Sequence, residues 1–423
     1  MWSKNMFNVG LKLWSVNQSY VQDAIRLYEQ GYCQYIELLA VPDSFEKTIM
    51  FWQDLKIPFI IHAPHFNLGI NLANTENFEK NMRLAQETLR FANALNAKII
   101  IFHPGANGDL AETIRQLKII NDPRIVIENK PYYGTKGHIV WKDIVCNGYS
   151  PDQIERIMQE TGVGFCFDIE HAVTAANSVG VDQMGFVRSF LALKPTMFHI
   201  TDGDWNGIFD QHKHLGAGSI KFDQILGLYP SDCTISIESK HDFQDKLDDF
   251  ETDVAYLRNI EKTVHEKIQE KIIVRPADIL DIHNVFELSN DPIVRNNSFL
   301  QEKIVWENHE LWFTQKLNDP QTIFYVIKSG CDDFVGYVRF DPEGELKHRI
   351  SIHLRAHYRG KGLGKTIIEQ ATELAISHGL TATVYAYIKE ENVPSLKSFE
   401  KAGYLYAGKT VKHNVPCIVM QYD

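Results

Sequence analysis

Short apolar runs rich in β-branched residues alternate with helical stretches over the first 240 residues of the chain. Eight of these runs are expected to be strands, and most are separated by segments whose apolar residues recur at three- and four-residue steps. Eight strand–helix units in roughly 250 residues are typical of a (β/α)8 barrel, an α/β fold. The predicted strands are Phe7–Leu13, Tyr35–Leu39, Phe59–His62, Lys98–His103, Ile125–Glu128, Gly164–Asp168, Met197–Ile200 and Thr234–Glu238.

The alternative for such a pattern is an open doubly wound sheet. That fold more often has a glycine-rich loop after its first strand, and this chain has none there. A polar, acidic helical stretch follows from about 243 to 271, and a new strand pattern begins at Lys271. At 423 residues two domains are the default expectation. We therefore expect a barrel domain over 1–262 and a compact α+β domain over 271–423.

From the third predicted strand onward, each strand ends in or is followed by a residue type that binds metal ions. A barrel builds its active site at the carboxyl ends of its strands, so these side chains should converge. A single histidine at a strand end is more often a structural group, but nine suitable residues on successive strands predict a site for zinc or manganese. They are His62, His103, Glu128, Asp168, His171, His199, Asp210, His212 and Glu238.

This run of residues resembles the xylose-isomerase-like TIM-barrel superfamily, and most closely its endonuclease IV branch. That branch orders its ligands His, His, Glu, Asp-x-x-His, His, Asp-x-His, Glu, and the nine residues above match that order one by one. The resemblance implies up to three zinc ions. Sugar isomerases and epimerases of the superfamily instead use a single ion, held here by Glu128, Asp168, His199 and Glu238.

The two branches imply different chemistry. In the epimerases the two glutamates, here Glu128 and Glu238, also move protons on the sugar. In the phosphoesterase branch the remaining histidines and Asp210 allow several ions to activate water and neutralise a phosphate. We expect the barrel to act on a sugar, a sugar phosphate or another small phosphoester.

The net charge of −11 disfavours nucleic acid as a partner, because an acidic surface repels a phosphate backbone. Two rival hypotheses stay open. One is a DNA-repair phosphoesterase with an accessory domain, and the other is a ligand-sensing protein whose barrel has lost its chemistry.

The chain has no apolar run of membrane-spanning length, no signal peptide at its start and no CxxC pair among its six cysteines. These features predict a soluble cytoplasmic protein. The sequence leaves the oligomeric state open, a homo-oligomer included.

Near the end of the chain, Tyr358–Thr366 reads YRGKGLGKT, and its last three residues are also how a nucleotide-binding P-loop ends. The P-loop pattern requires a glycine where Arg359 stands, and the preceding strand alternates apolar and polar residues instead of being uniformly apolar. The glycines can turn backbone N–H groups toward an anion at the start of the next helix, where the helix dipole also favours negative charge. This loop is therefore predicted to hold a pyrophosphate.

Together with the later segment from Tyr385 to Tyr404, the loop resembles the GNAT family of N-acetyltransferases over about residues 271–420. The resemblance implies acetyl-CoA as the cofactor, with its pyrophosphate on the loop amides and its arm near Asn392. The implied cofactor-binding residues are Arg359, Gly360, Lys361, Gly362, Leu363, Gly364, Asn392 and Ser395.

This chain departs from that family at Phe399, where the family often has a tyrosine that protonates the leaving thiolate. Tyr387, Tyr404 or a water could substitute, or the thiolate could leave unassisted. Candidates for the base are Glu345, His348 and His353, and we favour His353 because an imidazole titrates near neutrality. The segment that begins the domain is similar to acetyltransferases acting on amino sugar nucleotides. Such an acceptor would connect the acetyltransferase with a sugar-handling barrel.

Overall fold

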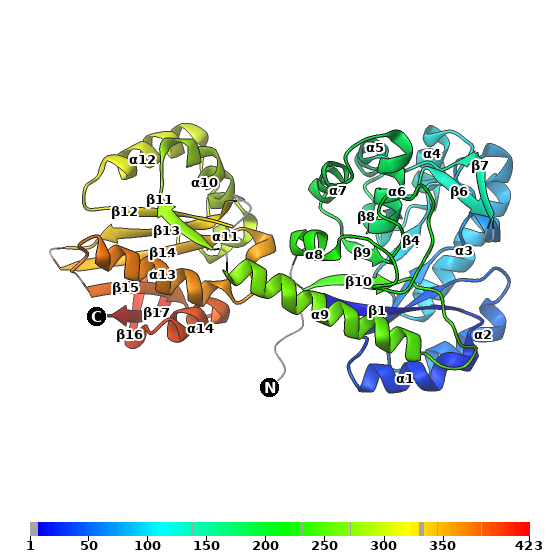
Figure 1. Cartoon of the computed structure of the whole chain (residues 1–423), viewed down its shortest axis with the longest axis horizontal. Helices are drawn as coiled ribbons and strands as arrows, with labels where there is room; N and C mark the ends of the chain where they lie inside the picture. Colours follow the sequence, from blue (N-terminus) through cyan, green and yellow to red (C-terminus); the bar gives the residue numbers. More distant parts are fainter. Residues whose placement is uncertain are drawn as a thin grey trace. The chain divides into compact units, whose positions relative to one another are not determined.

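The structure is a computed structural model that describes residues 7–136, 139–230, 232–270, 272–329, 334–344, 346–381 and 383–423. The chain divides into two compact units, Met1–Lys262 and Thr263–Asp423, and Figure 1 shows a barrel in the first and a sheet with helices in the second. In the described part of the chain, no helix has both the length and the apolar character needed to cross a membrane.

The first unit is a closed barrel of eight parallel strands, in the order β1-β10-β9-β8-β5-β4-β3-β2 (Figure 1). The barrel prediction is confirmed, and each strand differs from its predicted range by two residues or fewer at either end. The strands are β1 (Phe7–Trp14), β2 (Tyr35–Leu39), β3 (Phe59–His62), β4 (Ile100–Phe102), β5 (Ile125–Glu128), β8 (Gly164–Asp168), β9 (Met197–Ile200) and β10 (Cys233–Ile237).

Helices follow most of these strands and pack their apolar faces on the outside of the barrel. The local sequence sets their ends. The helix α5, for example, begins at Pro151 after the N-cap Ser150, and it stops at Gly162, whose φ is +76°. The helices are α1 (Val21–Glu29), α2 (Phe45–Gln53), α3 (Phe78–Ala94), α4 (Leu110–Ile120), α5 (Pro151–Thr161), α6 (Ile169–Val179), α7 (Gln183–Ala192), α8 (Phe222–Ile225) and α9 (Asp248–Glu270).

A ring of buried side chains fills the inside of the barrel, one from each of six neighbouring strands. The ring consists of Tyr35, Ile60, Ile101, Val126, Cys166 and Met197. Tyr35 needs a glycine opposite it on β1, since a Cβ at Gly10 would lie 2.2 Å from its ring. The Tyr35 hydroxyl also shares a hydrogen bond of 2.9 Å with Ser236 of β10. This ring forms the floor below the candidate metal ligands.

The structure also contains an antiparallel hairpin of β6 (Tyr133–Lys136) and β7 (Ile139–Val145), between β5 and α5 in the chain. The sequence pattern did not predict this hairpin. The hairpin forms its own two-stranded sheet and not part of the barrel, so it does not disturb the alternation of barrel strands and helices that carried the fold prediction.

The second unit is built on a seven-stranded sheet in the order β11-β12-β13-β14-β15-β17-β16. Its strands are β11 (Ile273–Pro276), β12 (Ile323–Lys328), β13 (Phe334–Pro342), β14 (Lys347–Leu354), β15 (Thr383–Lys389), β16 (Leu405–Lys412) and β17 (Val415–Tyr422). Its helices are α10 (Ile282–Ser289), α11 (Pro292–Asn297), α12 (Trp306–Asn318), α13 (Leu363–Ser377) and α14 (Val393–Lys401).

Among the described strands of this sheet, only β14 and β15 pair in parallel, and they do so over three residues, from Lys347 opposite Thr383 to Arg349 opposite Tyr385. Beyond that point both strands continue without pairing to each other. The strands therefore separate at the end of β14 that leads into the YRGKGLGKT loop.

The two faces of the sheet carry separate apolar cores, one that includes α13 and one that includes α10 and α12.

Candidate functional site

An ionisable residue follows each member of the inner ring of the barrel, two positions further along the same chain segment. Because side chains alternate along a strand, these residues face the same interior, one layer nearer the carboxyl ends of the strands. Lys12 of β1 and Glu238, directly after β10, join the layer through an ion pair with each other. The six residues above the ring are Glu37, His62, His103, Glu128, Asp168 and His199.

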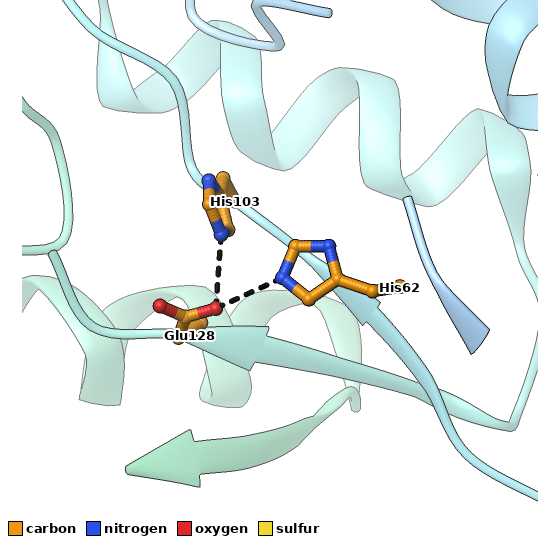
Figure 2. A group of neighbouring side chains, drawn as sticks. All are labelled: His62, His103 and Glu128. Carbon is orange, nitrogen blue, oxygen red and sulfur yellow. Dashed lines mark hydrogen bonds and ion pairs between the residues drawn. The ribbon is translucent and has the colours of Figure 1, made fainter. Parts of the chain in front are cut away.

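His62 and His103 point toward the same carboxylate oxygen of Glu128, as Figure 2 shows. Their Nε2 atoms lie 3.2 and 2.9 Å from Glu128 Oε2. Two ligand atoms on one tetrahedral zinc ion stand roughly 3.3 Å apart, so this spacing suits a shared ion. We call these three residues the first outer group.

His171, Asp210 and His212 form a second outer group. Asp210 Oδ2 lies 3.3 Å from Nε2 of His171 and 2.8 Å from Nε2 of His212. The Asp-x-x-His spacing has a local cause, since Asp168 caps α6 by accepting a hydrogen bond of 2.8 Å from the His171 backbone N–H. The capping residue and the first-turn histidine thereby reach the same interior.

His199 and Glu238 meet near the middle of the layer. His199 Nδ1 lies 2.7 Å from Glu238 Oε1 and 3.5 Å from Glu128 Oε2. On the other side of the ring, His199 Nε2 lies 2.9 Å from Glu37 Oε2. Sequence reasoning missed Glu37 because it stands inside the second strand, and only strand ends from the third strand onward were considered. The two-residue step along the strand would have found it.

Three of the imidazoles are oriented by backbone carbonyls. Nδ1 of His62, His171 and His212 lies 2.6, 2.9 and 3.0 Å from the carbonyl oxygens of Ala63, Asn129 and Glu238. Donation of the Nδ1 proton to each carbonyl leaves Nε2 as the coordinating nitrogen, which is how metal-binding histidines are usually held. The Nε2 atoms are the ones that face Glu128 and Asp210.

Two carboxylate oxygens of the expected ligands, Asp168 Oδ2 and Asp210 Oδ1, have no hydrogen-bond partner among the described residues. Asp168 is fully buried, and its Oδ2 is not hydrogen-bonded. A buried carboxylate oxygen without a partner is costly, and a divalent ion would satisfy it. Together with the oriented imidazoles, these unpartnered oxygens are what a metal centre at these residues would require. All nine residues expected to bind metal fall, together with Glu37, into groups of three whose potential ligand atoms lie within 4.8 Å of one another.

Two lysines also reach into the cluster, and sequence reasoning missed both. Lys12 Nζ lies 3.2 Å from Glu37 Oε1 and pairs with Glu238 Oε1. Lys130 Nζ lies 3.0 Å from Glu128 Oε1 and 3.4 Å from Nε2 of both His103 and His171. Lys130 stands two residues after Glu128 in the segment IENK, which is the signal that could have indicated it.

The carboxylates change the pKa values of the second outer group. Burial lowers the pKa of a histidine, but Asp168 and Asp210 outweigh it and raise the pKa of His171 to about 10. Asp210 likewise outweighs burial at His212 and raises its pKa to about 9. In the metal-free protein both imidazoles are therefore protonated at neutral pH, and an ion must displace those protons.

We expect the affinity for zinc to increase with pH between about pH 6 and about pH 8. Both protons are bound below the pKa values of about 10 and about 9, so each displaced proton should contribute roughly tenfold per pH unit. Competition titration of the metal-free protein against a chromophoric chelator, at several pH values, measures this dependence. An affinity that does not change with pH would show that neither histidine binds the ion.

The YRGKGLGKT loop leads into α13, which begins at Leu363. Gly360 and Gly362 have φ values of +75° and +72°, in the left-handed region that favours glycine. The Arg359 side chain is held inside the unit, since it donates hydrogen bonds to the Leu354 carbonyl (2.7 Å) and to Asp291 (2.8 Å). The loop thus offers its backbone N–H groups at a helix N-terminus.

Two further residues expected at the cofactor lie at the start of α14. Asn392 is the N-cap of this helix, and its side chain accepts a hydrogen bond of 3.3 Å from the Ser395 backbone N–H. Lys361 of the loop is buried, with 1% of its surface exposed. Gly364 of α13 packs against α14, since a Cβ at this glycine would lie 2.7 Å from Ser398 Oγ.

His353, the favoured base, stands on β14 opposite Tyr337 of β13, with ring centroids 4.6 Å apart. Burial and the positive charges of Arg339, Arg295 and Arg359 lower its pKa to about 3. The imidazole is neutral at pH 7, but it is a much weaker base than one titrating near neutrality. His348 contacts the Gln321 carbonyl (3.0 Å), and Glu345 lies outside the described residues.

The candidates for the acid differ in their surroundings. Phe399 and Tyr404 are buried in the core, and the Tyr404 hydroxyl shares a hydrogen bond of 2.9 Å with Thr372 of α13. Tyr387 of β15 is half-buried and donates a hydrogen bond of 3.0 Å to Glu343. Of the two tyrosines considered, Tyr387 is the one whose hydroxyl lies outside the apolar core.

The family model described as xylose isomerase-like TIM barrel matches residues 44–260, just over half of the chain. The chain belongs to this family. A second model, that of the acetyltransferase (GNAT) family, matches residues 284–404. Both resemblances found in the sequence are confirmed. Two enzyme families in one chain support a bifunctional enzyme.

The chain is 25% identical over 242 residues to an uncharacterized protein of Methanocaldococcus jannaschii, an alignment that covers 53% of this chain and 78% of that protein. It is also 25% identical to a probable endonuclease 4 of Staphylococcus aureus, which covers 48% of this chain and 75% of the relative.

Two solved structures are similar to the two units. A D-tagatose 3-epimerase-like protein is 18% identical with a TM-score of 0.46, and the match covers 61% of this chain and 99% of that protein. A spermidine N-acetyltransferase from Vibrio cholerae, in complex with CoA and spermine, is 16% identical with a TM-score of 0.34, covering 36% of this chain and 95% of the other.

Proposed function

We propose that this family member is a bifunctional enzyme with one active centre in each unit. The barrel is a metal-dependent enzyme that hydrolyses a phosphoester bond in a small substrate, such as a sugar phosphate. The second unit transfers an acetyl group from acetyl-CoA to the amine of an anionic acceptor, and an amino sugar nucleotide is the candidate acceptor.

The existence of the two outer groups supports hydrolysis in the barrel. The single-ion set implied for sugar isomerases uses Glu128, Asp168, His199 and Glu238 alone. It has no need of His62 and His103, or of His171, Asp210 and His212, yet these residues also gather with ligand spacing. More than one ion is what phosphoester hydrolysis can use, because the attacking and leaving oxygens both need stabilisation.

The two glutamates are poorly suited to moving protons. Burial would raise the pKa of Glu128, but Lys130, His103 and His199 outweigh it and hold the pKa well below its usual range. His199 and Lys12 outweigh burial in the same way at Glu238. A general base works best when its pKa lies near the working pH, so these surroundings favour hydrolysis over isomerisation.

Divalent ions held by these groups would polarise a phosphoryl oxygen and activate water. The chain itself supplies orientation and charge. The Ala63, Asn129 and Glu238 carbonyls fix three imidazoles, and Glu37 fixes His199. The layer is buried, which keeps bulk water from screening these interactions.

The barrel is tested with the full-length chain, made metal-free and then reconstituted with zinc or with manganese. We expect inorganic phosphate release from members of a sugar phosphate panel, and loss of that release with a chelator. Interconversion of aldose and ketose, followed by NMR in the same samples, without any phosphate release would assign the chemistry to the single-ion isomerase set instead.

The similarity to a probable endonuclease 4 favours a second candidate, hydrolysis of DNA at abasic sites. The net charge of −11 counts against it. Incision of a duplex with one abasic site, compared with phosphate release from sugar phosphates, decides between them. Efficient metal-dependent incision would show that DNA, and not a small phosphoester, is the substrate of the barrel.

For the second unit, the left-handed glycines and the start of α13 support binding of the acetyl-CoA pyrophosphate. In the transfer, the acceptor nitrogen bonds to the acetyl carbon, the carbon–sulfur bond breaks, and the proton lost by the amine balances the one gained by the CoA thiolate. His353, with its pKa of about 3, is proposed as a group that accepts a hydrogen bond from the amine.

Arg295 of α11 supports an anionic acceptor. Its guanidinium contacts the carbonyls of Leu300 and Glu302 and the Ser298 hydroxyl at 3.3–3.4 Å, and no described carboxylate pairs with it. Its Nε is buried and makes no hydrogen bond among the described residues. Arg295 also acts electrostatically on His353. A guanidinium that acts on His353 and has no carboxylate partner among the described residues can bind a phosphate or a carboxylate of the acetyl acceptor.

We expect Arg295→Gln to raise the KM for a UDP-linked amino sugar roughly 10- to 100-fold. This range corresponds to the binding free energy that a hydrogen bond to a charged group typically contributes. Release of free thiol from acetyl-CoA measures the rate. A free amino sugar without the nucleotide is the internal control, and its KM should not change. An equal effect on both acceptors, or on neither, would contradict an anion-binding role.

A further inference from the structure

Lys12 and Lys130 bring two positive charges into a layer that is expected to bind divalent cations. We propose that these ammonium groups take the place of one metal ion, so that the barrel binds two divalent ions and not three. The ions would be held by the first outer group (His62, His103 and Glu128) and by the second outer group (His171, Asp210 and His212), with Asp168 beside His171. This inference rests on the proposed metal dependence of the barrel.

The two oxygens of Glu128 have different partners. Oε2 faces the imidazoles of His62 and His103 at 3.2 and 2.9 Å. Oε1 lies 3.0 Å from Lys130 Nζ and 3.1 Å from His171 Nδ1, which donates to the Asn129 carbonyl. A glutamate that bridges two ions through both of its oxygens gives one oxygen to each ion. Here a lysine holds the second oxygen, so Glu128 can serve one ion and one ammonium.

Lys130 has the surroundings of a bound cation. Besides Glu128 Oε1, its Nζ lies 3.4 Å from Nε2 of His103 and 3.4 Å from Nε2 of His171, one imidazole from each outer group. The side chain is 14% exposed. The ammonium therefore lies between the two outer groups, where its charge offsets that of the carboxylates.

Lys12 acts on the opposite side of the layer. Its Nζ pairs with Glu238 Oε1, the same oxygen that lies 2.7 Å from His199 Nδ1. It also lies 3.2 Å from Glu37 Oε1. A third ion between the outer groups would need oxygens from both Glu128 and Glu238, and each of these glutamates is already neutralised by a lysine. Like charges at such short range repel strongly in a buried site.

The test is the zinc content of the full-length chain. The metal-free protein is reconstituted with zinc, freed of excess zinc by gel filtration, and measured by elemental analysis. We expect two zinc ions per chain for the wild type and three for the double variant Lys12→Met/Lys130→Met, because methionine keeps the length of the side chain and removes the charge. A matched double variant at exposed lysines, Lys56→Met/Lys118→Met, should stay at two.

Each other outcome is informative. Three ions in the wild type overturn the inference while leaving metal dependence intact, and this measurement needs no variant to fold. Two ions in both the wild type and a folded double variant also overturn it. No bound ion, or a single ion that Glu238→Gln releases and His103→Ala does not, overturns the proposed two-group centre itself. Thermal unfolding followed by circular dichroism establishes that each variant is folded.

Discussion

Glu128→Gln is expected to release most of the bound metal and to eliminate the metal-dependent activity of the barrel. Glu128 contacts more of the cluster than the other carboxylates do: its oxygens lie within 3.5 Å of His62, His103, His171 and His199 and of Lys130. Substitution of residues that merely orient a ligand already costs about 10- to 100-fold in metal affinity. Loss of a direct ligand should exceed that range.

Zinc affinity by chelator competition and phosphate release from a sugar phosphate measure this effect together. The control is Glu155→Gln, the same substitution at an exposed position of α5, which should leave both quantities unchanged. Glutamine keeps the shape of glutamate, so the variant should fold. A Glu128→Gln protein that retains its zinc and its activity would exclude Glu128 as a ligand.

The second large effect is expected at the cofactor loop, where Gly362→Val should raise the KM for acetyl-CoA by more than about tenfold. Gly362 is the N-cap of α13 with φ +72°, and a β-branched residue in the left-handed conformation costs roughly 1–2 kcal/mol or more. The loop would relax away from this conformation. Its N–H groups would then no longer be directed at the pyrophosphate.

Gly379→Val is the matched control for this variant. Gly379 lies just beyond the other end of α13, has φ +97°, and a Cβ there would meet no atom within 4 Å. Both variants should lose similar amounts of thermal stability from backbone strain, yet only Gly362→Val should change the KM for acetyl-CoA. Equal KM values in the two variants would mean that the loop does not contact the cofactor.

The ends of the barrel strands could be read from the sequence because the signal is local. Apolar runs such as Phe59–His62 and Ile125–Glu128 each end in the residue that faces the site, and the structure has both strands with these bounds. The Asp-x-x-His spacing of Asp168 and His171 is local as well, since the aspartate caps the helix that carries the histidine. Strand periodicity thus located the candidate ligands at the strand ends, whereas Asp210 and His212, in the loop after β9, were matched through the ligand order of the resemblance.

The hairpin β6–β7 and the lysines could not be read in this way. The hairpin depends on pairing between Tyr133–Lys136 and Ile139–Val145, and both segments lie between β5 and α5, outside the alternation of strands and helices that predicted the barrel. Lys12 lies in the middle of β1, where a lysine next to apolar residues gives no sign of facing inward. Its role depends on Glu37 and Glu238, which are 25 and 226 residues away along the chain.

By itself, the sequence determined the two fold classes, the strand order along the chain and the residue types at the strand ends, because each follows from the spacing of neighbouring residues. Only the tertiary structure decided which atoms meet. Closure of the barrel brings His199 to Glu37, 162 residues away, and Lys130 to His103 and His171. These contacts depend on the register between strands, and the sequence of one strand does not specify which residues of the neighbouring strands will lie next to it.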